Sequence, residues 1–527
     1  MKSKNRLTGL ILAVTLTAGL WPFNGNVAKA SSTVDLIGGT SSTSSTMLVD
    51  SSGNLWGWGA NTAGELGNVD FDPVTYPNKV AGGSSTIKSV SAYKDIVIAI
   101  FTDNTVWTWG DSNNGATGGY SMQQISAGSN AKQVSMGDRF ALILKNDGTV
   151  LAGGRNNAGQ LGTGSTSGAI LPFQTVAGLP NNIVEVSAGY DFALALTSTG
   201  EVWAWGSGQN SATGFGSDLS VPTLVTGFSG TNIQHISAGY SHSLALTSTG
   251  DVYAWGSNSS GQLGYPGIPS TGKSTTKYRV ATGAAKIYAG NSVSFAIKTD
   301  KTLLAWGQNT YGQLGNGNTT NAVAAQLVPG LTDVDYLALG GSSNHIVAVK
   351  TDNTIWTWGQ GGTSNGMTNG QQPNGSPYNS ANSTPTQVKP MAPMVLLFGA
   401  DQTKEVMVML PPNVGIAGYE YKLGQTGTWK TYDGAPMFMR ENVKIYVRTV
   451  DKLGTVGDED MTEITSIKST QPPIVTPTEP APDATVVTLL PGLNKTYPNI
   501  HIVTNKQTST QSGDLLVDGY AKASTKW

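Results

Sequence analysis

The sequence has no cysteine and only four histidines among its 527 residues. The lack of cysteine excludes disulfide cross-links, thiol nucleophiles and thiolate metal sites. The histidines show none of the spacings typical of metal ligands, so we expect neither a metal nor a cofactor. Charged residues make up only 12% of the chain. The fold must therefore be held together mainly by the packing of a large apolar core.

Long apolar runs are also missing, except for one at the N-terminus. Residues 7–21 are apolar, follow a basic start and precede the small-residue site Ala28-Lys29-Ala30. This pattern predicts a secretory signal peptide over residues 1–30, cleaved after Ala30, with a retained membrane anchor as the alternative. We expect a secreted protein, either extracellular or held at the cell surface, of a kind typical of Gram-positive bacteria.

The charge balance narrows the class of partner. Residues 31–527 contain 27 Lys and Arg against 33 Asp and Glu, a net charge of −6. A mildly acidic chain is poorly suited to bind the phosphate backbone of nucleic acids, because that binding depends on clustered Lys and Arg. We therefore expect no nucleic-acid partner, and no membrane association once the signal peptide is removed.

Glycine, by contrast, is abundant, with 67 residues, and much of it lies in a repeat of about 50 residues. The repeat is marked by a tryptophan-glycine pair, which becomes Gly153-Gly154 in the third unit. Successive pairs are separated by 51, 44, 52, 50, 51 and 52 residues, so seven units are present. The six tryptophan-glycine pairs begin at Trp58, Trp109, Trp205, Trp255, Trp306 and Trp358.

Each unit alternates as four short strands would. In "VWAW" the residues Trp203 and Trp205 are two apart, so they share one face of a strand. Burial of these indoles between neighbouring sheets explains them without any ligand. Four-stranded units repeated seven times predict an all-β fold, a seven-bladed β-propeller, over residues 34–391. An open solenoid is the rival architecture. The strand at residues 384–391 has no unit after it, and we expect it to complete the first blade and close the ring.

The phrase "ISAGYSHSLALTSTGDVYAWGSNSSGQLG", residues 236–264, resembles the repeat of the regulator of chromosome condensation family. The resemblance extends over residues 34–391 and implies a seven-bladed propeller. The founding member is a nuclear exchange factor for a small GTPase that binds chromatin, a role that an exported acidic chain does not suggest. A secreted bacterial inhibitor of β-lactamase built on the same repeat is nearer in context.

Two histidines, His242 and His345, occupy one position of the repeat. Other units place Ile96, Phe140, Phe192 or Val293 there. A position that accepts phenylalanine or valine is a packing position, so we interpret both histidines as structural.

The chain changes character after the repeats. Residues 393–468 alternate as strands and resemble the small immunoglobulin-like β-sandwich modules of Gram-positive surface proteins. Core and rim residues are expected from the set Tyr419, Tyr421, Trp429, Tyr446 and Val447. Residues 469–486 are rich in proline and threonine and predict a linker, and residues 487–527 cannot be classified.

The candidate binding residues follow the first strand of each unit. Equivalent turns of a propeller lie on one face, so these turns would form an arc of aromatic and charged groups, which are typical of protein interfaces. The candidates are Tyr93, Lys94, Asp95, Asp138, Arg139, Tyr190, Asp191, Tyr240 and Asn291, together with Tyr311 from a later loop on the same or the opposite face.

No catalytic constellation stands out in the sequence, so we interpret the chain as a monomeric, non-enzymatic interaction protein with a protein or cell-surface partner. A glycan-binding or glycan-hydrolysing propeller, using Asp95, Asp138 and Asp191 at one face, is the alternative. Inhibition of a secreted enzyme is a second alternative.

Overall fold

The computed structural model describes two parts of the chain. In the first it describes residues 36–41, 45–67, 74–79, 86–111, 122–228, 231–268, 272–361 and 381–388. In the second it describes residues 396–398, 406–409, 418–433, 437–439, 442–450, 456–464, 514–517 and 521–524. The expected signal peptide at 1–30 and the linker at 469–486 lie outside the described residues. The chain divides into two compact units, one of them Asp35–Lys389.

Among the described residues of Asp35–Lys389, 28 strands form seven four-stranded antiparallel sheets, each made of consecutive strands. The first three sheets are β1 (Leu36–Ser41), β2 (Ser45–Asp50), β3 (Leu55–Gly59) and β4 (Val74–Lys79); β5 (Ile87–Tyr93), β6 (Ile96–Phe101), β7 (Val106–Gly110) and β8 (Gln123–Ile125), followed by a short 3-10 helix at Ser126–Gly128; and β9 (Ala131–Met136), β10 (Phe140–Lys145), β11 (Val150–Asn156) and β12 (Ser167–Thr175).

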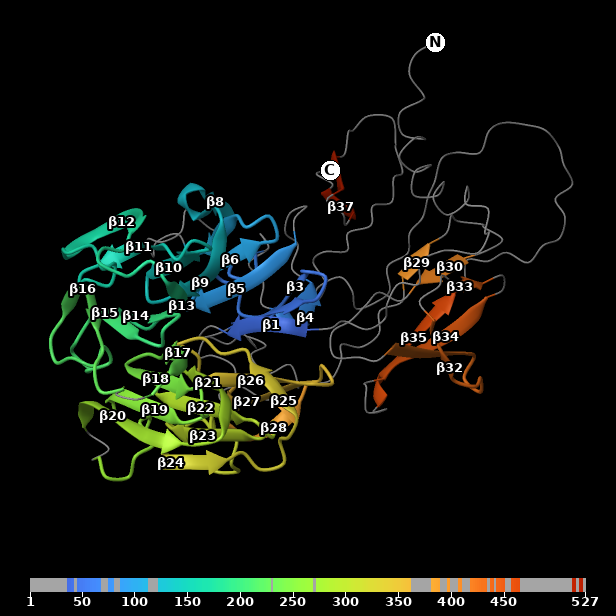
Figure 1. Ribbon diagram of the computed structural model, residues 1–527. Helices are drawn as coiled ribbons and strands as arrows, with labels where there is room; N and C mark the ends of the chain where they lie inside the picture. The colour runs from blue at the N-terminus through green and yellow to red at the C-terminus, as the bar shows by residue number, and fades with distance from the viewer. Residues whose placement is uncertain are drawn as a thin grey trace, which may run out of the picture. The chain divides into compact units, whose positions relative to one another are not determined.

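The other four sheets repeat this plan. They are β13 (Ile183–Ala188), β14 (Phe192–Thr197), β15 (Val202–Gly206) and β16 (Leu219–Leu224); β17 (Ile233–Ala238), β18 (His242–Thr247), β19 (Val252–Ser257) and β20 (Lys273–Ala281); β21 (Ala284–Ala289), β22 (Val293–Lys298), β23 (Leu303–Gly307) and β24 (Ala322–Leu327); and β25 (Val334–Leu337), β26 (His345–Lys350), β27 (Ile355–Gln360) and β28 (Ala381–Gln387). The first strand of each sheet lies around the centre, whereas β12, β16, β20 and β24 lie at the outside (Figure 1).

Apolar side chains fill the spaces between adjacent sheets. Trp205 is fully buried in a cluster that joins the third sheet, through Phe140, to its own fourth sheet. Trp203 packs against the same cluster from the same strand face and is half-buried. Full burial of an indole removes roughly 150–250 Å² from water, a gross stabilisation of about 4–6 kcal/mol as an upper estimate. The prediction that the indoles pack between sheets is confirmed.

Five of the six fully buried indoles in the described residues also make a hydrogen bond to the preceding sheet, whereas the Nε1–H of Trp58 has no partner there. The Nε1–H of Trp205 donates to the backbone oxygen of Gln160 at 2.9 Å, and Trp255 donates in the same way to Ala212 at 2.8 Å. The acceptors lie in the loops that follow the third strand of the previous sheet. The same bond is made by Trp109, Trp306 and Trp358.

Glycine is required after the tryptophan for a separate reason. Gly206 has a φ of +98°, and a Cβ placed there would lie 2.6 Å from the backbone oxygen of Asp191, in the turn between the first and second strands of its sheet. Only glycine allows both this left-handed conformation and this close approach. The tryptophan-glycine pair therefore combines a contact between sheets with a contact inside one sheet.

The first and seventh sheets meet through a buried hydrogen bond, between Thr46 Oγ1 and His345 Nε2 at 2.8 Å. His242 makes the equivalent bond to Ser294 of the next sheet, also at 2.8 Å. Burial lowers the pKa of His345 to about 4 and that of His242 to about 3. The interpretation of both histidines as structural is therefore supported by their complete burial and their bonds between sheets.

The strand that was expected to close the ring pairs within a different sheet from the one predicted. Residues 384–387 belong to β28, which pairs with β27 of its own sheet, with Gln387 opposite Trp356. The first sheet already has its fourth strand in β4. The prediction that residues 384–391 complete the first sheet is therefore wrong, because a strand joined locally to β27 is taken up by its own sheet.

The described residues of the second unit form three antiparallel sheets, two of which share a core. One is β29 (Leu396–Phe398), β30 (Val406–Met409) and β33 (Met437–Met439), and the other is β31 (Gly418–Leu423), β32 (Lys430–Thr431), β34 (Val443–Val450) and β35 (Val456–Ile464). Both sheets contribute to one core, with Val408 and Met439 from the first and Tyr419, Ile445 and Val447 from the second. A two-stranded sheet, β36 (Asp514–Val517) and β37 (Ala521–Ser524), is also described.

One buried position departs from the repeat and carries a charge. Glu65 occupies the place of Gln160, Gln262 and Gln313, all of which are fully buried. Its Oε2 accepts the N–H of Ala63 at 2.9 Å, whereas Oε1 has no hydrogen-bond partner. Burial, with a smaller contribution from Asp95 and Asp111, raises the pKa of Glu65 to about 7.

We predict that Glu65→Gln stabilises the fold at neutral and higher pH. Because the pKa of Glu65 is raised in the folded state, the contribution of its protonated side chain to the free energy of unfolding is fully present below about pH 4.5. This contribution is lost as the pH rises through 7. The free energy of unfolding of the variant should exceed that of the wild type by about 2–3 kcal/mol at pH 8. Denaturant titrations from pH 4 to 8 measure this. A gain no larger than that of the exposed control Glu201→Gln would contradict it.

A second prediction concerns acid stability. A neutral buried histidine takes up a proton on unfolding below about pH 6.5, so stability falls as the pH drops from there towards the lowered pKa of about 4. The double variant His345→Phe with Thr46→Ala recreates the apolar pairing of Phe140 and Ala193 in the third and fourth sheets. Between pH 6 and 4.5, the slope of unfolding free energy against pH should fall by about one proton, or roughly 1.4 kcal/mol per pH unit. An unchanged slope would refute this assignment.

Candidate interaction face at the inner turns

The turns between the first and second strands of neighbouring sheets are in direct contact. The backbone N–H of Asp138 donates to the backbone oxygen of Tyr190 at 2.9 Å, and that of Tyr240 donates to Gly290 at 3.1 Å. These bonds link the third sheet to the fourth and the fifth to the sixth. We call this set of turns, residues 93–95, 137–139, 189–191, 239–241 and 290–292, the inner-turn face.

Glycine is required where these turns approach one another. A Cβ on Gly189 would lie 2.2 Å from the ring of Phe192 and 2.7 Å from the backbone oxygen of Gly239. A Cβ on Gly239 would lie equally close, at 2.7 Å, to the backbone oxygen of Gly290. The glycines before Tyr190 and Tyr240 therefore allow the turns of successive sheets to approach one another closely.

Tyr93 stands in the register of these glycines and is buried rather than exposed. Its side chain is 1% exposed and packs in a core cluster with Ile96 and Met136. Its ring centroid lies 6.5 Å from that of Tyr190. Burial first, and then the carboxylate of Asp138, hold the pKa of the phenol well above its usual value. Tyr93 was expected among the surface turn residues, but the structure places it beneath them.

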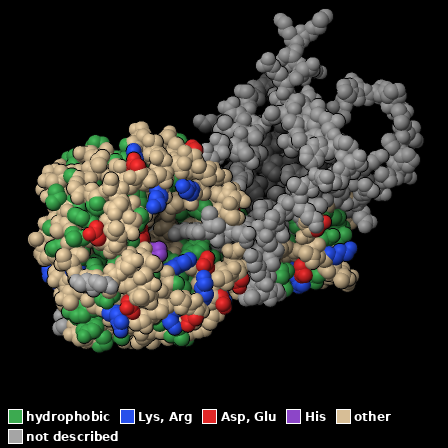
Figure 2. Space-filling model, viewed as in Figure 1, with side chains coloured by type: hydrophobic (Ala, Val, Ile, Leu, Met, Phe, Trp, Pro, Cys, Tyr) green, Lys and Arg blue, Asp and Glu red, His purple; other side chains and the backbone are tan. Residues whose placement is uncertain are grey.

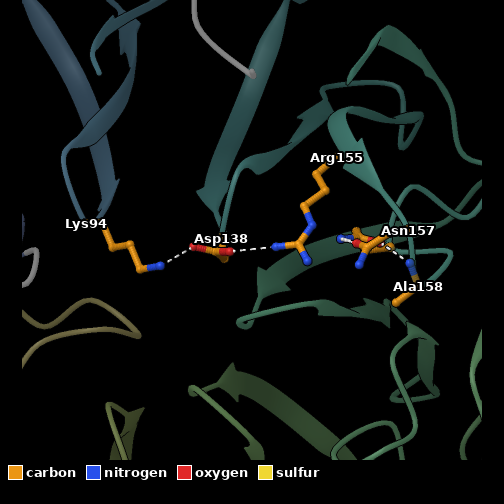
Figure 3. Close-up of polar contacts among 6 residues, drawn as sticks. Lys94, Asp138, Arg155, Asn157 and Ala158 are labelled. Carbon is orange, nitrogen blue, oxygen red and sulfur yellow. Dashed lines mark hydrogen bonds and ion pairs between the residues drawn. The ribbon is translucent and has the colours of Figure 1, made fainter. Parts of the chain in front are cut away.

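Asp138 is likewise buried, with 2% of its surface exposed, and both of its oxygens face a cation. Lys94 Nζ lies 2.6 Å from Oδ1, and Arg155 Nη1 lies 3.0 Å from Oδ2. Figure 3 shows the carboxylate between the two cations, which come from different elements. Asp138 therefore serves to hold Lys94 and Arg155 in place and is not itself an accessible group.

Sequence reasoning missed Arg155. The residue after each tryptophan-glycine position lies beside the inner turn of its own sheet, as shown by the bond from the N–H of Arg155 to the oxygen of Arg139 at 2.8 Å. The same bond joins Ser207 to Asp191 and Ser257 to Ser241. The register of the repeat could have identified this position as a second ring of variable side chains on the face.

Two tyrosines stack on this face. The rings of Tyr190 and Tyr240 have centroids 4.4 Å apart and planes 25° apart. Lys94 Nζ lies 5.5 Å from the centroid of the Tyr190 ring, within the range of a cation–π contact. Burial, followed by the proximity of Tyr190, raises the pKa of Tyr240 to about 12. The phenol of Tyr240 is therefore neutral across the physiological range. Both tyrosines remain partly exposed.

Asp95 and Asp191 are half-buried on the same face. Burial is the largest cause that raises the pKa of each carboxyl. A hydrogen bond from Ser207 opposes this increase at Asp191. Within the described residues, neither carboxylate takes part in an ion pair, in contrast with Asp138. Arg139 lies exposed in the turn that carries Asp138, with a φ of +62°.

The remaining candidates lie farther along the ring. Asn291 donates from Nδ2 to Oδ1 of Asn344 at 3.1 Å, and Asn344 in turn donates to Gln360 at 3.1 Å. Asn344 was not predicted. Tyr311 lies in a loop of the same face, since the N–H of Gln308 at the start of that loop bonds to Ser292 of the inner turn. The loop extends towards β28, where a Cβ on Gly312 would touch Ser383.

The described residues contain no group of three or more His, Asp or Glu side chains arranged to hold a metal ion. In the same residues, no helix is both long enough and apolar enough to cross a membrane. On the side of the Asp35–Lys389 unit visible in Figure 2, basic and acidic side chains are interspersed among a mainly uncharged surface.

Repeated four-stranded sheets whose inner turns meet on one face define a protein of the β-propeller class. The RCC1-like domain matches residues 120–409, and the regulator of chromosome condensation (RCC1) repeat matches residues 52–100 and 87–116. The chain belongs to the RCC1-like domain family, as the resemblance of its repeat implied.

Two relatives are about a quarter identical to this chain over the aligned residues. The ultraviolet-B receptor UVR8 of Arabidopsis thaliana is 27% identical over 331 residues, which cover 60% of this chain and 73% of UVR8. The human E3 ubiquitin-protein ligase HERC2 is 26% identical over 353 residues, covering 62% of this chain but only 7% of HERC2. The match therefore corresponds to a small part of HERC2.

Solved structures agree on the fold. Prp20p of Saccharomyces cerevisiae superposes with a TM-score of 0.54 at 20% identity, covering 68% of this chain and 87% of Prp20p. The yeast RCC1 (Prp20) in its complex with Kap60 gives a TM-score of 0.55, also at 20% identity, covering 70% of this chain and 90% of that one. At this identity the likeness establishes the fold alone.

Proposed function

We propose that this chain is a non-enzymatic interaction protein whose inner-turn face binds a protein partner. In this proposal the seven sheets are the seven blades of a closed propeller. The stacked pair of Tyr190 and Tyr240, fixed beside Lys94 and Asp138, is the observation that carries the proposal. Rigid aromatic anchors with a polar rim are what protein interfaces use for affinity, because they bury area at little conformational cost.

The relatives support a role in binding proteins. One solved structure concerns the binding of Prp20p to Gsp1p and histones, and another contains Kap60 bound to the same yeast protein. The saturation of Asp138 by two cations supports a scaffold rather than acid–base chemistry, because a carboxylate held in two ion pairs is poorly placed to exchange protons. These observations favour binding by an arranged surface.

The proposal includes the location and the other segments. Residues 1–30 act as a signal peptide, the propeller covers residues 34–391, and the mature protein is extracellular or at the cell surface. The two sheets that share the core of Tyr419 and Val447 support an immunoglobulin-like module over residues 393–468. In this arrangement the module would carry the propeller, and the partner would be a protein in the medium or the cell envelope.

A capture experiment tests this function. Full-length protein, as wild type and as Tyr190→Ala with Tyr240→Ala, is immobilised and exposed to medium and solubilised envelope from the producing cells. We expect the double variant to capture at least tenfold less of the partner, because it loses both aromatic anchors. The control Val221→Ala changes an exposed residue of the outer strand β16 and should capture normally.

Unfolding temperatures of all variants show whether a loss of capture reflects lost structure. Capture of every partner at wild-type level by a folded double variant would refute a role for the inner-turn face.

A further inference from the structure

Three side-chain amides form a hydrogen-bonded row on the inner-turn face. Asn291, in the inner turn of the sixth sheet, donates from Nδ2 to Oδ1 of Asn344 in the seventh sheet at 3.1 Å. Asn344 in turn donates from Nδ2 to Oε1 of Gln360 at 3.1 Å, and the backbone N–H of Gln360 donates to the backbone oxygen of Asn344 at 3.0 Å. We call these three residues the amide row. All three are half-buried, so the row is both held in place and open to solvent.

The amide row has free hydrogen-bonding groups at both ends. Because each amide donates to the next in the same direction, Oδ1 of Asn291 is left as an acceptor at one end, and the Nε2–H groups of Gln360 are left as donors at the other. Within the part of the chain that the structure describes, neither group has another hydrogen-bond partner. Since each amide is oriented by its neighbour, a ligand that binds the row orders little further side-chain structure.

The amide row lies between the other chemical groups of the face. On one side, the backbone N–H of Tyr240 bonds to Gly290, the residue before the first amide of the row, at 3.1 Å. On the other side, the backbone N–H of Lys94 donates to Oγ of Ser342, in the turn that carries the second amide, at 3.1 Å. The row therefore continues the series of turn contacts from the stacked tyrosines to Lys94.

The scaffold itself does not require amides at these positions. Asn344 precedes the second strand of its sheet, where the fourth sheet has Asp191, and Gln360 follows the tryptophan-glycine pair, where the fourth sheet has Ser207. There a hydroxyl bonds to a carboxylate instead. Because sheets of the same plan form with other residues in these places, the amides add hydrogen-bonding capacity that the fold does not use up.

We propose that the amide row binds the main chain of an extended segment of the partner polypeptide. A peptide N–H would donate to Oδ1 of Asn291, and a peptide C=O would accept from Nε2 of Gln360. An extended chain presents both N–H and C=O groups along each edge, and side-chain amides offer the matching acceptor and donor without a net charge. The inference rests on the proposed function, since it specifies which part of the partner binds at the same face.

Phage display on the immobilised full chain provides the probe. A library of random dodecapeptides is depleted on the double variant Asn291→Ala with Gln360→Ala, selected on the wild type, and the tightest binder is synthesised with a fluorescent label. By fluorescence anisotropy, we expect each single alanine variant to bind this peptide at least tenfold more weakly than the wild type, because each lacks one free end of the row. Unfolding temperatures show that the variants are folded.

Asn146→Ala is the matched control. Asn146 is an exposed asparagine whose Nδ2 donates to another amide, Oδ1 of Asn130, at 2.7 Å. It lies in the turn between β10 and β11, at the other end of the third sheet from the inner turn. This variant should bind the peptide as the wild type does, and an equal loss in Asn146→Ala and Asn291→Ala would overturn the inference.

Single N-methylation of the peptide tests whether its main chain is what binds. At the residue whose N–H bonds to Asn291, replacing that hydrogen with a methyl group should weaken binding to the wild type at least tenfold. The same change should weaken binding to Asn291→Ala by less than twofold, because the acceptor is already missing there. A scan in which no position shows this coupling would contradict the inference, as would a depleted library that yields no binder.

The capture experiment separates the two proposals. Capture that depends on Tyr190 and Tyr240 but is unchanged in Asn291→Ala and Gln360→Ala would overturn the amide row and leave the protein-binding face standing. Peptide binding with the expected coupling, without capture that depends on the tyrosines, would support the amide row and overturn the role of the tyrosines. Binding to a glycan array that depends on Asn291, with no peptide binder, would mean that the row takes sugars and would refute main-chain recognition.

Discussion

The structure depends on one repeated interaction, the burial of an indole between two sheets with its N–H bonded to the sheet before it. Trp205 fills the space between the third and fourth sheets and donates to Gln160 across that space. The indole therefore supplies both apolar area and a directional bond, and the bond fixes how far one sheet is displaced from the next. Five of the seven sheets make this complete contact: the third sheet has Gly153 in place of the indole, and Trp58 of the first sheet is buried with no hydrogen-bond partner among the described residues. Because most neighbouring sheets hold the same relation, their inner turns meet in a regular series on one face.

The contacts on the inner-turn face depend on this regular series of turns. Close packing at Gly189 and Gly239 brings the turns of neighbouring sheets together, so that side chains of three different sheets, Lys94, Asp138 and Tyr190, form one set of contacts. Glycine recurs at the turn position where neighbouring sheets pack closely, as at Gly189 and Gly239, whereas the residues that follow it differ from sheet to sheet. Tyr93 breaks the glycine pattern, and its hydroxyl is buried without a hydrogen-bond partner among the described residues.

The sequence was sufficient for the repeated sheets, because the spacing of the tryptophan-glycine pairs records the packing of each unit on the next. It misplaced the strand at residues 384–387, since a strand that completes a distant sheet and one that pairs with the preceding hairpin have the same local pattern. At the face, it identified Tyr190 and Tyr240 as turn residues but missed Arg155 and Asn344. Their contacts arise between elements that only the folded arrangement brings together.

Chemical denaturation of Trp205→Ala beside Trp203→Ala tests the central role of the buried indoles most directly. The two residues share one strand and one face, but Trp205 is fully buried and bonded to the neighbouring sheet, whereas Trp203 is half-buried. We expect Trp205→Ala to lower the free energy of unfolding by about 3–5 kcal/mol, and Trp203→Ala to lower it by clearly less. Equal losses in the two variants would contradict the account.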